Sequence, residues 1–279
     1  MSDPRTQTSR PATISDVARE AGTGKTSVSR YLNGETNVLS ADLRQRIETA
    51  IERLNYRPNQ MARGLKRGRN RLLGLLAADL TNPYTVEVLR GVEAACHALG
   101  YMPLICHAAN ELEMERRYLQ LLTTYRVEGM IVNALGADEN ALKSLRGGGI
   151  PTVLVDRSVE GFAADMIGLD NAAAIETGLR HLFARGFQSL HFVVQPFEHV
   201  SSRHLHARFG DAWQKRAALI AIDDPDWAEL IGVTTIRQPT YDIGYRAVEF
   251  VHERIDGGTG DFHESLLPGE LHVRASTAS

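Results

Sequence analysis

Four residues with hydrogen-bonding side chains, Lys25, Thr26, Ser29 and Arg30, recur at a spacing that places them on one side of a short helix. Side chains of these types reach phosphate oxygens and the base edges of a DNA major groove. A glycine-containing turn at residues 22–24 separates this helix from an earlier short one, as in a helix-turn-helix motif. The pattern predicts nucleic-acid recognition, and a purely structural helical hairpin is the competing interpretation.

The same stretch, Gly22 to Ser27, superficially resembles a phosphate-binding loop. That motif requires a glycine five residues before Gly24, where Arg19 stands. It also requires a buried strand before the loop, where the sequence predicts a helix. We therefore exclude a nucleotide-binding loop here.

A basic segment, Tyr56 to Arg71, follows the helical region and contains six basic residues and no acidic one. Met61, Ala62 and Leu65 have helical spacing, but one or two turns are too short to be stable alone. A flexible linker is the alternative. We expect a segment that becomes helical only when a partner such as DNA stabilises it.

Charge is distributed unevenly along the chain. Residues 1–71 contain 14 Lys and Arg against 7 Asp and Glu, whereas the rest contains 17 against 27. A basic head on an acidic body indicates a polyanionic partner for the head, with a solvated charged surface as the equally weighted alternative. The two cysteines, the polar N-terminus and the lack of a long apolar run predict a cytoplasmic location and no membrane association.

The elements that must position these residues are of two kinds. Residues 13–56 show the apolar periodicity of three short helices, and Ser40 is placed to cap the third. From Arg71 onward, short apolar runs alternate with helical patterns. We expect strands at residues 72–78, 102–106, 130–135, 151–155, 167–169 and 190–194, and helices at residues 84–99, 112–125, 139–145 and 172–184. This alternation predicts parallel sheets with helices on both faces and a ligand at the carboxyl ends of the strands.

Three motifs make the sequence similar to a known family: Thr13-Ile14-x-Asp16-Val17-Ala18-x-x-Ala21-Gly22, Val28-Ser29-Arg30-Tyr31-Leu32-Asn33 and Tyr56-Arg57-Pro58-Asn59. Together with Asp79-Leu80-Thr81-Asn82-Pro83-Tyr84, they resemble the lactose/galactose-repressor family of bacterial regulators. The resemblance implies an α/β fold: an all-α helix-turn-helix headpiece plus a periplasmic-binding-protein-like sensor of two doubly wound parallel-sheet lobes. The implied division is a tail (1–12), the headpiece (13–57), a hinge (58–71) and an effector-sensing and dimerisation domain (72–279).

The resemblance also assigns DNA contacts. Lys25, Thr26 and Arg30 would read bases, while Thr13, Ser29 and Asn33 would contact phosphates. In the hinge, Leu65 matches an apolar wedge inserted into the minor groove, and its neighbours complete that surface. These neighbours are Asn59, Ala62 and Lys66. Gly24 departs from the family, which usually has Ser at this N-cap.

Effector contacts are implied in the body, just after strands or at helix starts. The implied residues are Tyr84, with Asn82 and Thr85 near it, Asn133, Asp156, Arg203, Asp223 and Gln238. Asp156 and Asp223 would accept hydrogen bonds from sugar hydroxyls, and Arg203 would bind a carboxylate. Without the family, helix caps or surface ion pairs would be the preferred interpretation of each residue. The resemblance is greatest to regulators of 2-ketogluconate use, which implies this sugar acid as the effector, acting as inducer.

One part of the family pattern is missing. About 60 family residues, including two core strands, have no counterpart near residues 204–208. Either the protein is a deletion form of the family, or the sequence joins segments that flank an omitted stretch. We expect a second lobe shortened in this way to expose sheet edges and to bind effector weakly.

The sequence thus predicts a homodimeric transcriptional repressor that binds double-stranded operator DNA under effector control. The tail after Glu270 lacks leucine heptads that would build a tetramer. A sugar-binding protein without regulatory DNA binding is the alternative, and the basic headpiece argues against it. No nucleophile elbow, metal-ligand spacing or dinucleotide motif occurs, so we expect neither an enzyme nor a cofactor or metal.

Overall fold

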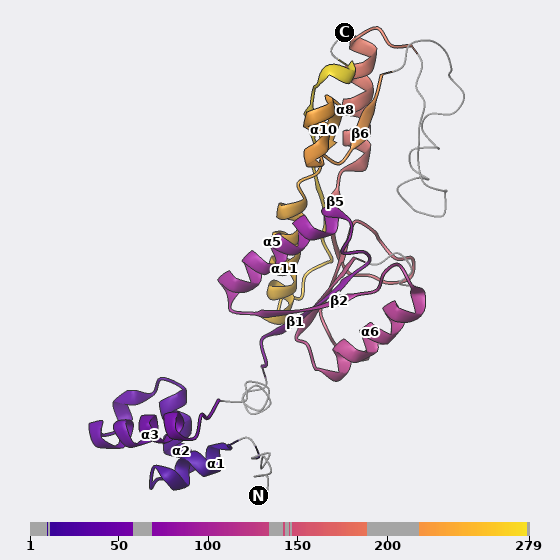
Figure 1. Ribbon diagram of the computed structural model, residues 1–279. Coiled ribbons are helices and arrows are strands. Elements are labelled where there is room, and N and C mark those ends of the chain that lie inside the picture. Colours follow the sequence, from indigo (N-terminus) through magenta and orange to yellow (C-terminus); the bar gives the residue numbers. More distant parts are fainter. Residues whose placement is uncertain are drawn as a thin grey trace, which may run out of the picture. The chain divides into compact units, whose positions relative to one another are not determined.

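A computed structural model describes residues 10, 12–57, 69–133, 142, 145, 147–188 and 218–277. The chain divides into two compact units, Met1–Asn70 and Arg71–Ser279 (Figure 1).

The N-terminal unit contains three α-helices whose buried faces meet in one small core. Its elements are α1 (Ile14–Glu20), α2 (Lys25–Leu32), the 3-10 helix η1 (Thr36–Val38) and α3 (Ala41–Arg53). Val17, Val28 and Ile47 are fully buried and give each α-helix an anchor in that core. The Ser40 hydroxyl accepts a hydrogen bond from the Leu43 amide at 3.2 Å. The three predicted helices and the Ser40 cap are therefore confirmed.

The second unit is built on a main sheet of six parallel strands in the order β2-β1-β3-β4-β5-β8. The strands are β1 (Leu72–Ala77), β2 (Met102–His107), β3 (Gly129–Asn133), β4 (Thr152–Val155), β5 (Asp165–Leu169) and β8 (Glu264–Leu267). The helices that cover this sheet are α5 (Pro83–Leu99), α6 (Leu112–Thr124) and α11 (Thr240–Ile255).

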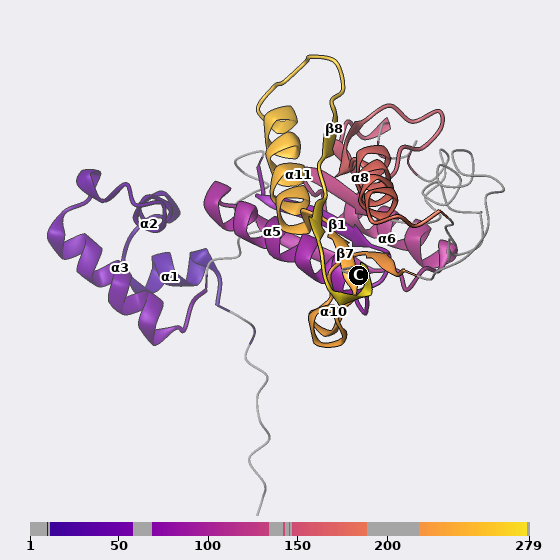
Figure 2. The ribbon, with the colours of Figure 1, turned by 90° about the horizontal axis from the view of Figure 1, so that it is seen from above.

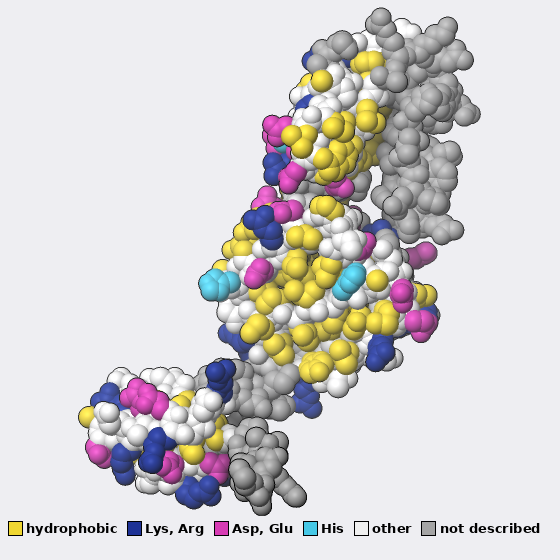
Figure 3. Space-filling view, in the orientation of Figure 1, with side chains coloured by type: hydrophobic (Ala, Val, Ile, Leu, Met, Phe, Trp, Pro, Cys, Tyr) yellow, Lys and Arg dark blue, Asp and Glu magenta, His cyan; other side chains and the backbone are white. Residues whose placement is uncertain are grey.

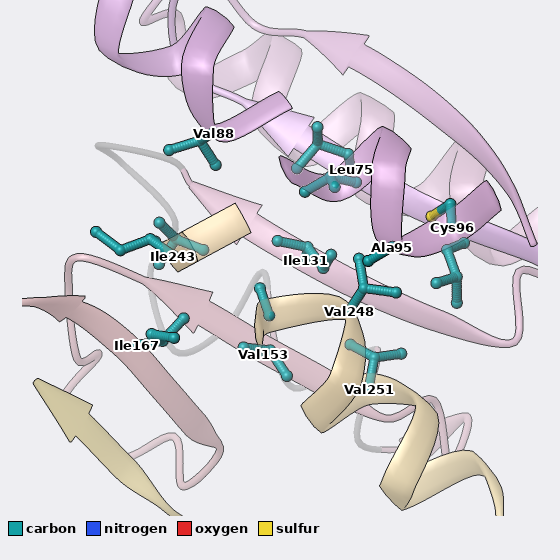
Figure 4. Packing of buried hydrophobic residues seen from close by; sticks show 14 of the residues in the cluster. Leu75, Val88, Ala95, Cys96, Ile131, Val153, Ile167, Ile243, Val248 and Val251 are labelled. Carbon is teal, nitrogen blue, oxygen red and sulfur yellow. The ribbon is translucent and has the colours of Figure 1, made fainter. Parts of the chain in front are cut away.

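Side chains alternate between the two faces of the main sheet, as the period of two along a strand requires. On one face, Leu75, Ile131 and Val153 pack with residues of α5 and α11 (Figure 4). On the other face, Leu76 and Val132 pack with residues of α6. The main sheet thus lies between two helical layers, with α5 and α11 side by side on one of them (Figure 2).

A close approach between α5 and α11 depends on two glycines. A Cβ atom at Gly91 would lie 2.0 Å from the Tyr241 carbonyl oxygen, and one at Gly244 would lie within 3 Å of the Val88 carbonyl group. No larger side chain fits either position without movement of the backbone. These glycines therefore set the distance between the two helices that cover the main sheet.

A smaller sheet follows the order β6-β7-β9, with β6 and β7 parallel and β9 antiparallel to β7. The remaining elements of the unit are α8 (Asn171–Ala184), β6 (Ile220–Ile222), α10 (Asp226–Ile231), β7 (Thr234–Arg237), β9 (Glu270–His272) and the 3-10 helix η2 (Ala275–Thr277). The described chain passes between the two sheets after β5, after β7 and between β8 and β9. The predicted α/β sensor with a smaller second sheet is confirmed.

Several predicted features lie outside the described residues. They are most of the hinge, the helix expected at residues 139–145, the strand expected at residues 190–194 and the site of the missing family segment near residues 204–208. Within the described part of the chain, no helix is both long and apolar enough to span a bilayer.

Candidate functional sites

The start of α1 is fixed by a compact set of hydrogen bonds around Asp16. The Thr13 amide and hydroxyl both donate to the Asp16 carboxylate, at 2.9 and 2.6 Å. These bonds hold the pKa of Asp16 well below its usual range. Arg10 and Arg19 add ion pairs at 3.3 and 2.6 Å. The Thr13 hydroxyl proton is thus engaged within the motif, while its role as a phosphate contact stays a prediction.

The helix α2 presents a polar surface because its apolar side is anchored. Val28 is fully buried against α1 and α3. Lys25, Thr26 and Arg30 are exposed, whereas Ser29 is half-buried. Asn33, at the C-terminal cap of the helix, is also half-buried.

The cations of α2 differ from other cations of the same unit. Arg19, Arg46 and Arg53 each pair with a carboxylate within 3.1 Å. Neither Lys25 nor Arg30 forms an ion pair with any residue that the structure describes. Exposed cations without a carboxylate partner are available to phosphates and base edges. The expected hinge contacts, Asn59, Ala62, Leu65 and Lys66, lie outside the described residues.

In the second unit, Asp156 directly follows β4 and adopts a left-handed backbone conformation with a φ of 66°. Its amide donates to the Ile167 carbonyl at 2.9 Å, and its carboxylate accepts from the Asn133 side-chain amide at 3.2 Å. Gly168 makes room for it, since a Cβ atom there would lie 3.0 Å from the Asp156 Cα atom. Burial raises the pKa of Asp156 to about 6.

Asp223 repeats this arrangement on the smaller sheet. It follows β6 with a φ of 78°, and its amide donates to the Ile236 carbonyl at 3.0 Å. The Gln238 side-chain amide donates to its carboxylate at 2.5 Å. Burial raises the pKa of Asp223 as well. Each sheet therefore holds a half-buried carboxylate at a strand end, fixed by a side-chain amide from the end of a neighbouring strand.

Tyr84 joins the two carboxylates into one cluster. It lies in the first turn of α5, where the Asn82 side chain caps the helix by accepting from the Tyr84 amide at 3.0 Å. Burial raises the pKa of the Tyr84 phenol, and the charges of Asp156 and Asp223 raise it further. Its hydroxyl is buried and has no hydrogen bond of good geometry to another described residue. The hydroxyl nevertheless interacts with the Asp156 carboxylate, so a ligand that binds beside Asp156 would compete for this interaction.

The structure brings together five of the seven predicted effector residues. We call these the ligand cluster: Tyr84, Asn133, Asp156, Asp223 and Gln238. Thr85 is buried at the start of α5, without a described contact to that cluster, and Arg203 lies outside the described residues. Carboxylates, amides and a phenol together suit a ligand rich in hydroxyl groups.

Sequence reasoning missed Arg157, which is half-buried next to this cluster. Its charge acts on both Asp156 and Tyr84. The signal was its position, one residue beyond an expected ligand and just after a strand. Among the described residues, no group of three or more metal-ligating side chains is placed to hold a metal ion.

Three family descriptions match the chain in succession. Residues 13–59 match "Bacterial regulatory proteins, lacI family". Residues 70–221 match "Periplasmic binding proteins and sugar binding domain of LacI family", and residues 215–277 match "Periplasmic binding protein-like domain".

Curated relatives match over nearly their whole length. The HTH-type transcriptional regulator PtxS of Pseudomonas putida is 37% identical over 337 aligned residues, which cover 99% of this chain and 99% of the relative. The HTH-type transcriptional regulator KdgR of Bacillus subtilis is 30% identical, with coverage of 97% and 99%. The alignment with the Pseudomonas protein spans 337 positions and this chain has 279 residues, so at least 58 of those positions have no residue here.

Solved structures share the fold at lower identity. The lac repressor dimer bound to operator and the anti-inducer ONPF has a TM-score of 0.83 at 20% identity, covering 97% of this chain and all of that one. The transcriptional regulator CelR in complex with cellobiose has a TM-score of 0.64, also at 20% identity, covering 95% and 99%.

Proposed function

Because the chain belongs to the lacI family of bacterial regulatory proteins, we propose that it is a repressor released from operator DNA by a sugar acid. Its relatives are transcriptional regulators, and it is itself a DNA-binding regulator with a sugar-binding domain rather than an enzyme. The finer proposal concerns which surface binds DNA, which residues bind the effector and what the effector is.

The DNA contact is proposed for the exposed side of α2. Lys25, Thr26 and Arg30 would reach base edges in the major groove, with Thr13, Ser29 and Asn33 on phosphates. The exposure of the first three side chains supports this assignment, as does the absence of an ion pair between Lys25 or Arg30 and any described residue. The hinge residues Asn59, Ala62, Leu65 and Lys66 would then enter the minor groove, with Leu65 as an apolar wedge.

The effector is proposed to bind at the ligand cluster. Asp156 and Asp223 would accept hydrogen bonds from sugar hydroxyls, Tyr84 would offer its phenol, and Asn133 and Gln238 already orient the two carboxylates. Thr85 and Arg203 would complete the site. Resemblance to regulators of 2-ketogluconate use supports that sugar acid as the effector. We expect binding that is weak but saturable, because the second lobe is proposed to be shortened.

Effector binding would be coupled to DNA binding through a homodimer. The cluster takes Asp156 from the main sheet and Asp223 from the smaller one, so a ligand that contacts both would favour one arrangement of the two sheets. Hydrophobic side chains cover much of the visible face of the second unit (Figure 3). Separately, Met102 and Ile105 on the edge strand β2 are exposed apolar side chains of this unit. Exposed apolar surface of this kind supports association of two copies, and two headpieces would then read a two-fold symmetric operator.

The single observation that carries the effector proposal is the pair of half-buried carboxylates, each bound by a side-chain amide, beside the Tyr84 hydroxyl. Calorimetric titration of the full chain with 2-ketogluconate tests it. We expect saturable binding at one site per chain that Asp156→Asn and Asp223→Asn each weaken. Binding that neither substitution alters would place the effector elsewhere.

A further inference from the structure

Arg157 is a half-buried arginine next to the ligand cluster. It follows Asp156 at the end of β4 and forms neither a hydrogen bond nor an ion pair with the residues that the structure describes. Burial lowers the pKa of its guanidinium, and the charges of Asp156 and Glu115 oppose that effect. A guanidinium has five N–H donors, and their desolvation is costly unless an acceptor compensates for it.

Two other shielded arginines show what a structural arginine looks like in this fold. Arg254 makes two 2.8 Å bonds to the Asp165 carboxylate and donates to backbone carbonyls of the following loop. Arg274 pairs with Asp224 at 2.8 Å and donates to Val233 and Thr235. Both are saturated by their own chain. Arg157 is not, although it lies beside the residues proposed to bind the effector.

An acidic effector poses an electrostatic problem at the ligand cluster. Its carboxylate would enter a site that already contains the carboxylates of Asp156 and Asp223, and like charges at short distance repel each other. A neutral sugar would meet no such barrier. Acid binding therefore needs a cation nearby, and Arg157 is the described cation whose charge reaches both Tyr84 and Asp156.

We propose that Arg157, rather than Arg203, to which the family resemblance gives this role, binds the carboxylate of the effector and thereby selects sugar acids over neutral sugars. This inference rests on the proposed effector function of the same cluster. A planar guanidinium can hold a carboxylate through two parallel N–H···O bonds, which gives geometric selectivity as well as affinity. In the bound state, the Arg157 guanidinium would then have an acceptor for its N–H groups, which the described residues do not provide.

A comparison of 2-ketogluconate with its neutral methyl ester tests the proposal on the full chain. Calorimetry would measure both ligands on the unmodified protein, on Arg157→Gln and on Arg157→Lys. We expect Arg157→Gln to weaken binding of the acid by about tenfold or more, the size of a charge-assisted hydrogen bond. Binding of the ester should change less than about twofold. The affinity of Arg157→Lys for the acid should lie between those of the unmodified protein and Arg157→Gln, because lysine keeps the positive charge but cannot form two parallel hydrogen bonds to a carboxylate.

Arg180→Gln serves as the matched control, because Arg180 is an exposed cation on α8 paired with Glu176 at 2.7 Å. Equal weakening of acid and ester by Arg157→Gln, or no weakening of either, would overturn the proposal. Circular dichroism and operator affinity of each variant would reveal a folding defect. If Arg157→Gln is misfolded, the ratio of acid affinity to ester affinity in Arg157→Lys tests the proposal instead. Failure of the unmodified protein to bind the acid at all would instead contradict the proposed effector function.

Discussion

The ionised side chain of Asp156, at the end of β4, lowers the stability of the folded protein. Its folded-state pKa of about 6 lies above the ordinary value of 3.8 because burial disfavours the charged form. The stabilising contribution of the protonated group is therefore complete below pH 4 and is lost as the pH rises through about 6. At neutral pH, the ionised Asp156 side chain is therefore less stable in the folded protein than in the unfolded chain, where water solvates it.

We predict that Asp156→Asn stabilises the protein above pH 6 by about 1–3 kcal/mol and has little effect near pH 4. Asn tolerates the left-handed backbone of this position as well as Asp does. Thermal unfolding between pH 4 and 8 measures this difference.

Asp224→Asn is the matched control of opposite sign. Hydrogen bonds and ion pairs from Thr235 and Arg274 outweigh burial and lower the pKa of Asp224. Its contribution is present at neutral pH and is lost as the pH falls through the lowered pKa, so this substitution should destabilise the protein at pH 7. A stabilising Asp224→Asn, or a pH-independent Asp156→Asn, would contradict this assignment of charges.

Also at the residue scale, Lys25→Ala and Arg30→Ala should each reduce operator binding because the side chains are exposed and unpaired on α2. Loss of a base contact costs about 1–3 kcal/mol, or roughly 5- to 150-fold in affinity, mostly for the specific site. Arg44→Ala removes an exposed charge from α3 and controls for net charge. Gel-shift titrations on operator and random DNA would show an equal loss in all three variants if the assignment is wrong.

At this scale the sequence predicted the ligand positions only through family resemblance. The residue types at 133, 156, 223 and 238 are ordinary, and strand ends often carry such residues as caps. The left-handed backbone conformation of Asp156 and Asp223 does not follow from local sequence, and neither does the partial burial of Arg157. Both depend on which strands become neighbours in the sheet. The family resemblance therefore predicted which positions contact the effector, whereas the direction of each pKa shift follows only from the folded structure.

At the scale of elements, the packing of α5 on α11 leads to a prediction in which two effects compete. Gly91→Ala gains about 1 kcal/mol of helix propensity. The added Cβ atom would lie 2.0 Å from the Tyr241 carbonyl oxygen, which forces the two helices apart. Overpacking typically costs 1–3 kcal/mol or more. We expect a net loss of stability, measured by denaturant unfolding.

Gly178→Ala is the control for Gly91→Ala, because it also lies inside a helix, α8. Its Cβ atom would lie 3.2 Å from the end of the flexible Ile236 side chain. Ile236 is buried, but a shift of a few tenths of an ångström at the end of its side chain relieves this contact, so this variant should lose much less stability than Gly91→Ala. If Gly91→Ala lost equally little stability, close contact of the two helices would not determine stability.

Most long elements were predictable, because the spacing of apolar residues along the sequence distinguishes a helix from a strand. The three headpiece helices, α5, α6 and the strands β1 to β5 lie where the sequence placed them, within a few residues. The sequence did not predict α10, β8, β9 or the 3-10 helices. They are short and are held by tertiary contacts, such as the antiparallel pairing of β9 with β7.

For the whole molecule, the proposed dimer should depend on exposed apolar side chains of the second unit. Leu230, on α10, is 86% exposed, which is unusual for a leucine without a partner. We predict that Leu230→Lys leaves the unfolding temperature unchanged and weakens self-association in sedimentation experiments. Val38→Lys, at a 62% exposed valine of the headpiece, should not affect association. A monomer at micromolar concentration before any substitution would contradict the dimer.

The most direct test of the central claim is the affinity of the full chain for operator fragments of genomic DNA. Fluorescence anisotropy would measure it at one fixed salt concentration, with and without 2-ketogluconate, because phosphate contacts make affinity depend steeply on salt. An effector-released repressor should bind a specific fragment with nanomolar affinity and bind it at least about tenfold more weakly with 2-ketogluconate. Equal affinity for operator and random DNA would contradict the account.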